Sequence, residues 1–391
     1  PYIFVGGILS AITFVLLWQL DENNSSDYNF WYFLIMSMVF LIGNTMFATP
    51  LVGLGYEMTS DYNERTRLMA FSQTVGLLAW VIVPWFWVII ADPDFFSNQA
   101  EGVRTMAIYV GIACFLLGLL PAIFCRGMDS ANMGNRKKLS FTSIFSNLKD
   151  LFISIKEAVN NKPFMKLCGA TFLVFNGYQI VASFSFIIIV FYIFKGSYEA
   201  TSTWPAWFSS IGALVSAFLV IPIVSKMATK WGKKNAFLIS TALSIVGYAM
   251  KWWAFTPENI WFSFIPIPLM SFGLGSLFTL MMSMTADVCD LDELVNGMPR
   301  KEGTFGALYW WVVKLGQGLA LVLGGLVLKL VGFEGGAAIQ SVETMTNLRI
   351  ADITLPAFTA GLAILIMLGY NITEKKARAI KTELEERRGE L

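Results

Sequence analysis

Long apolar stretches occupy most of this 391-residue chain, and they limit how it can fold more than any other feature. Each is about 20 or more residues long, enough for a helix to cross roughly 30 Å of hydrocarbon. Only 14% of the residues are charged, against about 25% in an average soluble domain. We therefore predict an all-α polytopic membrane protein. The ten predicted spans are Tyr2–Leu20, Phe30–Gly55, Leu68–Ala91, Val103–Cys125, Phe164–Phe194, Thr203–Ser225, Ala236–Phe255, Ile260–Thr285, Thr304–Gly332 and Ile350–Tyr370.

Basic residues alternate strongly between successive connections. Twenty-one Lys and Arg lie in every second connection or in the C-terminal tail, against two in the others. Positive side chains are retained in the cytoplasm. We therefore expect both ends of the chain in the cytoplasm, and a bacterial inner membrane as the location.

One basic stretch, Arg126–Pro163, divides four predicted spans from six. Many transporters consist of two similar bundles of six helices. Lys230–Asn235 forms a basic turn before the third span of the second half, whereas Pro1 opens the first span here, so we expect two helices before residue 1. The expected domains are a first bundle at 1–126, a linker with an amphipathic surface helix at 127–163, a six-helix bundle at 164–371 and a tail at 372–391.

The sequence shows none of the residue patterns of common catalytic and metal sites. It has no histidine, and its cysteines show no paired spacing: Cys114, Cys125, Cys168 and Cys289. Neither a nucleophile–base pair nor a metal-ligand motif is present, and no nucleic-acid surface is implied. We therefore expect neither an enzyme nor a metal site.

Three motifs carry a family resemblance. Gly55–Phe71 resembles the signature after the fourth helix of the glycoside–pentoside–hexuronide:cation symporters, the major-facilitator branch that includes melibiose permease. Thr285–Asp290 and Tyr309–Lys314 resemble the end of helix ten and the middle of helix eleven of that family. The resemblance covers essentially the whole chain and implies a major facilitator fold, seen as helices three to twelve of twelve.

The resemblance also implies roles for particular residues. Lys314 falls on the helix-eleven lysine of the family pattern, Gln73 on a sugar-contacting arginine, and Asn44 on a sugar-side tyrosine. Ala48 departs from the pattern, which has an aspartate of the cation site there. The implied coupling ion is Na⁺ or H⁺, with no other cofactor.

Lys314 lies about three turns inside its predicted span. Intramembrane charges usually face a cavity or a counter-ion, so we predict that Lys314 binds substrate and couples transport. The alternative is a structural ion pair or a side chain that snorkels to the membrane surface, although snorkelling from this depth is strained. Trp310 lies one turn earlier on the same helical face and is the candidate for stacking on a sugar ring, with core packing as the alternative.

Two amides in the fifth predicted span, Asn176 and Gln179, can both donate to and accept from substrate hydroxyls. Hydrogen bonding between helices explains such residues about equally well.

Charged clusters at the predicted cytoplasmic ends of spans suggest latches that hold the two halves closed. The alternative is solvated loop charge, because exposed pairs contribute little. The predicted gate residues are Glu57, Asp61, Arg65, Arg67, Asp287 and Asp290.

Together with the resemblance, these features predict a secondary active transporter of a sugar or glycoside, with Na⁺ or H⁺ as the coupling ion. We expect it to act as a monomer in the bilayer by alternating access. The alternatives are a lysolipid transporter of the same superfamily and a transport-inactive sensor or membrane subunit, which Ala48 leaves open.

Overall fold

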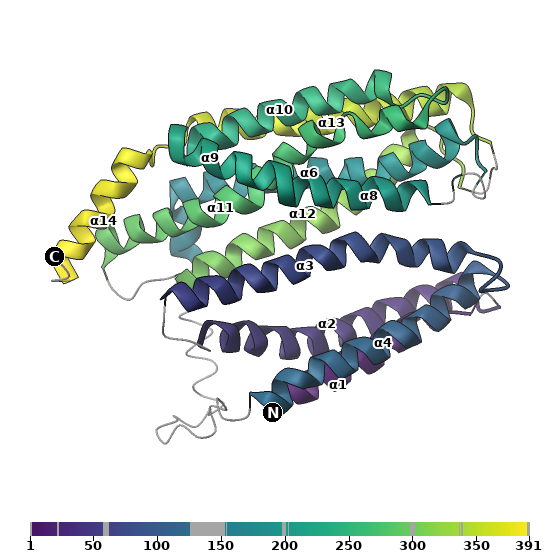
Figure 1. Cartoon of the computed structure of the whole chain (residues 1–391), viewed down its shortest axis with the longest axis horizontal. Helices are drawn as coiled ribbons and strands as arrows, with labels where there is room; N and C mark the ends of the chain where they lie inside the picture. The colour runs from purple at the N-terminus through teal and green to yellow at the C-terminus, as the bar shows by residue number, and fades with distance from the viewer. Residues whose placement is uncertain are drawn as a thin grey trace. The chain divides into compact units, whose positions relative to one another are not determined.

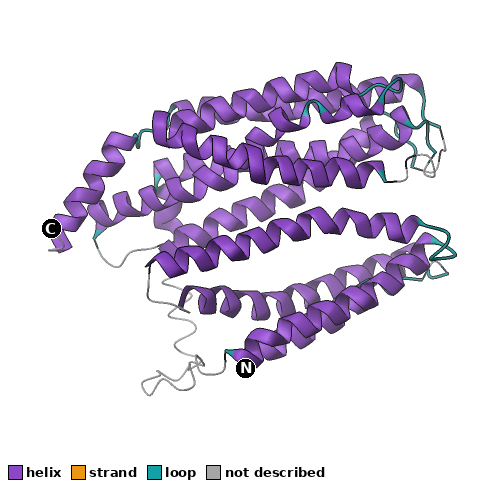
Figure 2. Ribbon diagram, viewed as in Figure 1, coloured by secondary structure: helices purple, strands orange, loops and turns teal. Residues whose placement is uncertain are grey.

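The computed structural model describes residues 2–21, 23–57, 62–125, 153, 155–197, 201, 203–297, 302–335, 337 and 339–388. All regular structure in these ranges is helical, as Figure 2 shows, which confirms the predicted all-α class. The chain forms two compact units, Pro1–Lys138 and Leu139–Leu391.

The first unit contains the helices α1 (Tyr2–Leu17), α2 (Ser26–Glu57), α3 (Tyr62–Ala91) and α4 (Gln99–Phe124), shown in Figure 1. Glycines allow α1 and α2 to approach closely. A Cβ atom added at Gly6 would lie 2.5 Å from the backbone nitrogen of Phe47, and one added at Gly43 would lie 2.8 Å from that of Ser10. Small residues at a crossing let membrane helices bring their backbones together in this way.

The second unit contains the remaining labelled helices. They are α6 (Lys162–Ile187) with the π-helical segment η3 (Ile188–Ile193), α8 (Trp204–Val215) with the π-helical η4 (Ser216–Val220) and α9 (Ile221–Trp231), α10 (Lys233–Ala254), the 3₁₀ segment η5 (Ile260–Phe264), α11 (Ile267–Asn296), α12 (Glu302–Leu330), α13 (Val342–Leu368) and α14 (Glu374–Arg388).

Local sequence signals set several of these boundaries. The side chain of Asn161 caps α6 by accepting a hydrogen bond of 3.1 Å from the backbone N–H of Phe164. Gly232, with φ of 81°, separates α9 from α10, and Gly297, with φ of 79°, ends α11. Glycine adopts this left-handed backbone without the Cβ penalty, so these two positions suit sharp helix ends.

Each of the ten predicted spans coincides with a helical segment of the described chain. The clearest difference is at α11, predicted to end at Thr285, which continues to Asn296. The acidic residues after Thr285 therefore lie on a helix rather than in a loop. Asp292 and Glu293 are buried there, with 7% and 6% of their surface exposed. Their packing therefore allows the helix to continue past Thr285, where their acidic character led us to end the predicted span.

Seven helical segments of the described chain are long and apolar enough to cross a membrane, judged by length and composition. Tyr2–Leu17 and Ala79–Ala91 are shorter apolar helices. α10 falls outside this set, because it carries Lys251 and several hydroxyl side chains.

The core of the second unit forms around α6 and α11. Their most apolar windows are 61% buried, against 22% for α12 and 28% for α13, so these two helices lie innermost. The largest buried cluster gathers side chains of α6, α9, α10, α11, α12 and α13. A second cluster joins the end of α6, η3, α12 and α13.

The predicted linker falls largely outside the described residues. Of its expected amphipathic helix, residues 153 and 155–160 are described, and they are helical.

Candidate functional site

α12 presents two stripes of residues along its length. The buried stripe consists of Tyr309, Val313, Gly316 and Ala320. Most of the remaining surface of α12 is exposed, including Trp311, Leu315 and Leu319. Within it, Trp310, Lys314 and Gln317 lie on one side of the helix and are called the exposed stripe. With 3.6 residues per turn, positions three and four apart share a side of the helix, which places the predicted coupling lysine beside the predicted stacking tryptophan. Within the described residues, Lys314 makes no hydrogen bond or ion pair.

The ring of Trp310 lies parallel to the ring of Phe278 on α11, with centroids 6.1 Å apart and an angle of 20° between the planes. Phe278 in turn meets the edge of Phe175 on α6 at 5.9 Å. Trp310 remains 44% exposed and Phe278 37% exposed. The pair therefore combines packing within the unit with apolar ring surface that a ligand can contact.

The two amides of α6 have different surroundings. Asn176 is buried, and its Nδ2 donates a hydrogen bond of 3.1 Å to the backbone carbonyl of Gly316 on α12. Its Oδ1 is also buried and has no hydrogen-bond partner in the described part of the chain. Gln179 lies one turn further along α6 and is half-buried.

The predicted residues of the first unit are described less fully. Asn44 is exposed on α2, and Ala48 is half-buried one turn later. Gln73 lies in α3, but its side chain is outside the described part of the structure, as are those of the predicted gate residues Glu57, Asp61, Arg65 and Arg67. Asn44 and Gln73 belong to the first unit and Trp310 and Lys314 to the second, so a substrate site that combines all four stays a prediction.

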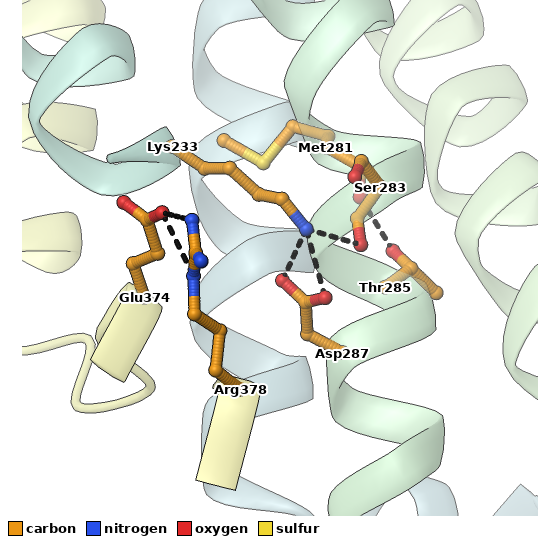
Figure 3. A network of polar contacts seen from close by, with 7 residues as sticks. All are labelled: Lys233, Met281, Ser283, Thr285, Asp287, Glu374 and Arg378. Atoms are coloured by element: carbon orange, nitrogen blue, oxygen red, sulfur yellow. Dashed lines mark hydrogen bonds and ion pairs between the residues drawn. The ribbon is translucent and has the colours of Figure 1, made fainter. Parts of the chain in front are cut away.

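The predicted gate residue Asp287 belongs to a charge network at the first turn of α10 (Figure 3). Lys233 Nζ lies 2.8 Å from Oδ1 and 2.6 Å from Oδ2 of Asp287 on α11. It also approaches the carbonyl of Ser283 at 3.4 Å. The two charged side chains remain 34% and 19% exposed, so this is a partly hydrated ion pair within the second unit.

The next lysine joins α10 to the end of α13. Lys234 Nζ donates hydrogen bonds of 2.7 Å and 2.8 Å to the carbonyls of Leu368 and Tyr370. The last carbonyls of a helix have no partner within it, so a lysine there satisfies them and opposes the negative end of the helix dipole.

The first turns of α14 and of α10 line the same cavity. The first residue of α14, Glu374, accepts hydrogen bonds of 3.1 Å and 2.5 Å from Arg378 one turn later, as Figure 3 shows. A cavity of about 710 Å³ lies between this turn and the helices α9, α10 and α11. Lys233, Asp287 and the predicted gate residue Asp290 all line it. Contact of Asp287 and Asp290 with the first unit stays a prediction.

A second ion pair involving α10 lies at its last turn. Lys251 pairs with Asp352 of α13, and both side chains are 2% exposed. Lys251 Nζ also donates a hydrogen bond of 2.9 Å to Ser185 Oγ of α6 and lies 4.9 Å from the centre of the Phe255 ring. Asp352 Oδ1 has no hydrogen-bond partner in the described part of the chain. This dry pair therefore joins three helices.

Arg349 reinforces the same end of the unit. Its guanidinium lies 4.2 Å from the ring centre of Tyr192 in η3 and 4.5 Å from that of Trp252. It donates to the Tyr192 hydroxyl at 2.8 Å and to the Trp252 carbonyl, one of the last in α10, at 2.5 Å. Arg349 thus stacks between aromatic rings while capping α10.

Sequence analysis did not identify the Lys251–Asp352 pair. A usable signal was present, because a basic and an acidic residue each lie inside a predicted span, near ends assigned to the same side of the membrane. Intramembrane charges require partners, so two such residues at one depth are candidates for each other. Within the described residues, no cluster of three or more Cys, Asp and Glu side chains could hold a metal ion.

Residues 1–374 match the family model described as MFS/sugar transport protein. The chain is 23% identical to a glucuronide carrier protein homolog of Escherichia coli, over 97% of this chain and 78% of that protein. It is 23% identical to an isoprimeverose transporter of Lactiplantibacillus pentosus, over 86% of this chain and 66% of that protein. It is also 22% identical to a sodium-dependent lysophosphatidylcholine symporter of Gallus gallus, over 100% of this chain and 76% of that protein.

Proposed function

This chain belongs to the MFS/sugar transport family, and from that premise we propose that it is a cation-coupled symporter of a sugar or glycoside. Family membership makes it a multi-pass membrane transporter rather than an enzyme, as the sequence predicts. The proposal adds the substrate class, the coupling to Na⁺ or H⁺, and alternating access of a site between two bundles.

The observation that carries the proposal is the exposed stripe of α12. Lys314 and Gln317 supply hydrogen-bond donors, and Gln317 also an acceptor, beside the ring surface of Trp310 and Phe278. Sugars present hydroxyl groups on their edges and apolar C–H surfaces on their faces. A stripe that offers both kinds of contact suits such a ligand.

Lys314 is the proposed coupling residue. An unpaired ammonium group within a membrane helix is costly, about 2.5–3.5 kcal/mol on insertion scales, unless a cavity hydrates it or an anion pairs with it. The movement of a coupling ion or an anionic substrate next to Lys314 changes that cost, which gives a physical link between ion and sugar binding.

We also propose that both termini are cytoplasmic. Protease access to a C-terminal tag in inverted membrane vesicles would test this orientation.

Proteoliposomes containing the purified protein test the proposal directly. Uptake of methyl β-D-glucuronide, isoprimeverose and lysophosphatidylcholine is measured with an inward Na⁺ gradient, an inward H⁺ gradient or neither. We expect gradient-driven accumulation of a sugar, and loss of that accumulation in Lys314→Ala at equal reconstitution. Accumulation in Lys314→Ala equal to that of the parent would show that the lysine does not couple transport.

A lysolipid carrier is the second candidate, because the relatives include lysophosphatidylcholine symporters of similar identity over the whole chain. Uptake of lysophosphatidylcholine without any sugar would favour it. Absence of transport for all three compounds would favour the transport-inactive sensor.

A further inference from the structure

The helices α12 and α6 meet at Gly316. Gly316 belongs to the buried stripe, and a Cβ atom added there would lie 3.5 Å from Phe172 Cδ2 and 3.8 Å from Phe175 Cδ1. The two helices are therefore in ordinary van der Waals contact at this point. In the same place Asn176 Nδ2 donates its hydrogen bond to the Gly316 carbonyl, in otherwise aromatic surroundings.

Apolar packing alone constrains rotation weakly, because side chains of a smooth interface can slide past one another. A hydrogen bond to a particular backbone carbonyl is directional and defines one register. Successive residues of an α-helix turn by about 100°, so Lys314 projects about 160° and Trp310 about 120° around the axis from Gly316. Holding Gly316 against α6 therefore turns both residues away from α6.

Direct contact between Asn176 and a transported molecule does not fit this geometry. The side chain is 3% exposed, and its donor group is already engaged by α12. The Asn176 side chain contacts the buried stripe of α12 at Gly316, and not the exposed stripe that carries Trp310 and Lys314.

We propose that Asn176 is a positioning residue, which acts on transport by fixing the rotation of α12 and so the direction of Lys314 and Trp310. The inference deepens the proposed function and rests on it for the statement that these two residues face the substrate. The rotational effect itself does not depend on which compound is carried.

The first experiment needs no substrate. Lys314→Cys is labelled with a charged methanethiosulfonate in proteoliposomes, with and without Asn176→Leu, and labelling of the parent chain supplies the background from its own cysteines. Hydrogen bonds between membrane helices contribute about 0.6 to 1.7 kcal/mol, so we expect a change in labelling rate of about three-fold or more. An unchanged rate would overturn the proposal.

Ser185→Ala is the matched control, since it removes a different polar contact of the same helix, the one to Lys251. We expect Ser185→Ala to leave the labelling rate at Lys314→Cys unchanged. An equal change in both variants would indicate general loosening of α6, which would also overturn the proposal.

The second experiment is a double-mutant cycle on equilibrium binding of whichever of the three compounds accumulates, since Lys314→Ala is expected to lose accumulation. Asn176→Leu should raise Kd about three- to ten-fold, but less than about two-fold when Lys314 is already alanine, because its effect passes through α12. Equal effects in both backgrounds would indicate a direct substrate contact and overturn the proposal. If no compound accumulates, the proposed function fails, while the labelling experiment still decides the role of Asn176.

Discussion

The two ends of α10 each carry a lysine paired with an aspartate, and the two pairs have very different surroundings. Lys233 meets Asp287 beside the cavity under α14, where both groups keep contact with water. Lys251 meets Asp352 in a dry interface of α6, α10 and α13. The same two functional groups thus form a pair that water can compete for at one end, and a pair sealed from water at the other.

The difference bears on how each end of the unit can move. Separating the dry pair would leave a charge in an apolar interface, which is strongly unfavourable. Separating the hydrated pair exchanges one set of polar contacts for another at small net cost. We therefore expect the helices to stay together at the Lys251 end, and rearrangements of the unit to occur at the Lys233 end.

The largest effect should come from breaking the dry pair on one side. Lys251→Met leaves the Asp352 carboxylate buried without its cation, and we expect a loss of about 3–5 kcal/mol in the free energy of unfolding. The measurement is thermal or denaturant unfolding in detergent, with Lys234→Met, which removes a more exposed lysine of the same helix, as a reference. A loss below about 1 kcal/mol would contradict a buried, unpaired charge at Asp352, because it would mean that the carboxyl is hydrated or takes up a proton.

Removing both charges of the dry pair should cost much less. In Lys251→Met combined with Asp352→Leu, no unpaired charge remains, and apolar side chains fill a similar volume. We expect the double variant to recover most of the stability lost in Lys251→Met. If it is as unstable as the single variant, hydrogen bonding to Ser185 rather than charge pairing holds this interface.

The hydrated pair should respond weakly. Lys233→Met should lower the free energy of unfolding by about 1 kcal/mol or less. Added salt should shrink the difference between variant and parent, because it screens exposed charges. A salt-independent loss as large as that of Lys251→Met would remove the distinction between the two ends of α10.

The smallest effect is expected at a third, more exposed pair, in the first unit. The backbone N–H of Asn23 and the nearby Arg104 hold the pKa of Asp21 below its usual range. This stabilisation is present above the usual Asp pKa of about 4 and is lost as the pH falls through the lowered value. The unfolding temperatures of the parent and of Asp21→Asn, measured between pH 7 and pH 3, should therefore converge at the acidic end. A constant difference across this range would contradict the assignment.

The sequence predicted the helices well, because about 20 apolar residues in a row have few alternatives to a membrane helix. It also placed Trp310 and Lys314 on one side of their helix, since helical periodicity alone decides that. Periodicity does not say which neighbour a side of a helix meets. The partner of Lys251 therefore had to come from the structure, as did the contact of Asn176 with Gly316.

The boundary of α11 shows a second limit of sequence analysis. Asp287, Asp290 and the acidic residues after them resemble the end of a membrane span, and a composition-based prediction stops before them. In the structure the helix continues, because Asp287 forms an ion pair with Lys233 and the side chains of Asp292 and Glu293 are buried. Partners supplied by distant parts of the chain thus extend a helix beyond its apolar segment.

The π-helical segment Ile188–Ile193 changes the phase of the rod that begins as α6. An extra residue in one turn rotates everything after it by about 100° relative to an unbroken α-helix. Asn176 of α6 contacts α12, whereas Gly177 of α6 and Tyr192 of the π-helical segment both lie against α13. The angular position of Tyr192 relative to α13 therefore depends on the extra residue, and deleting one residue from this segment would rotate Tyr192 by about 100° relative to Arg349.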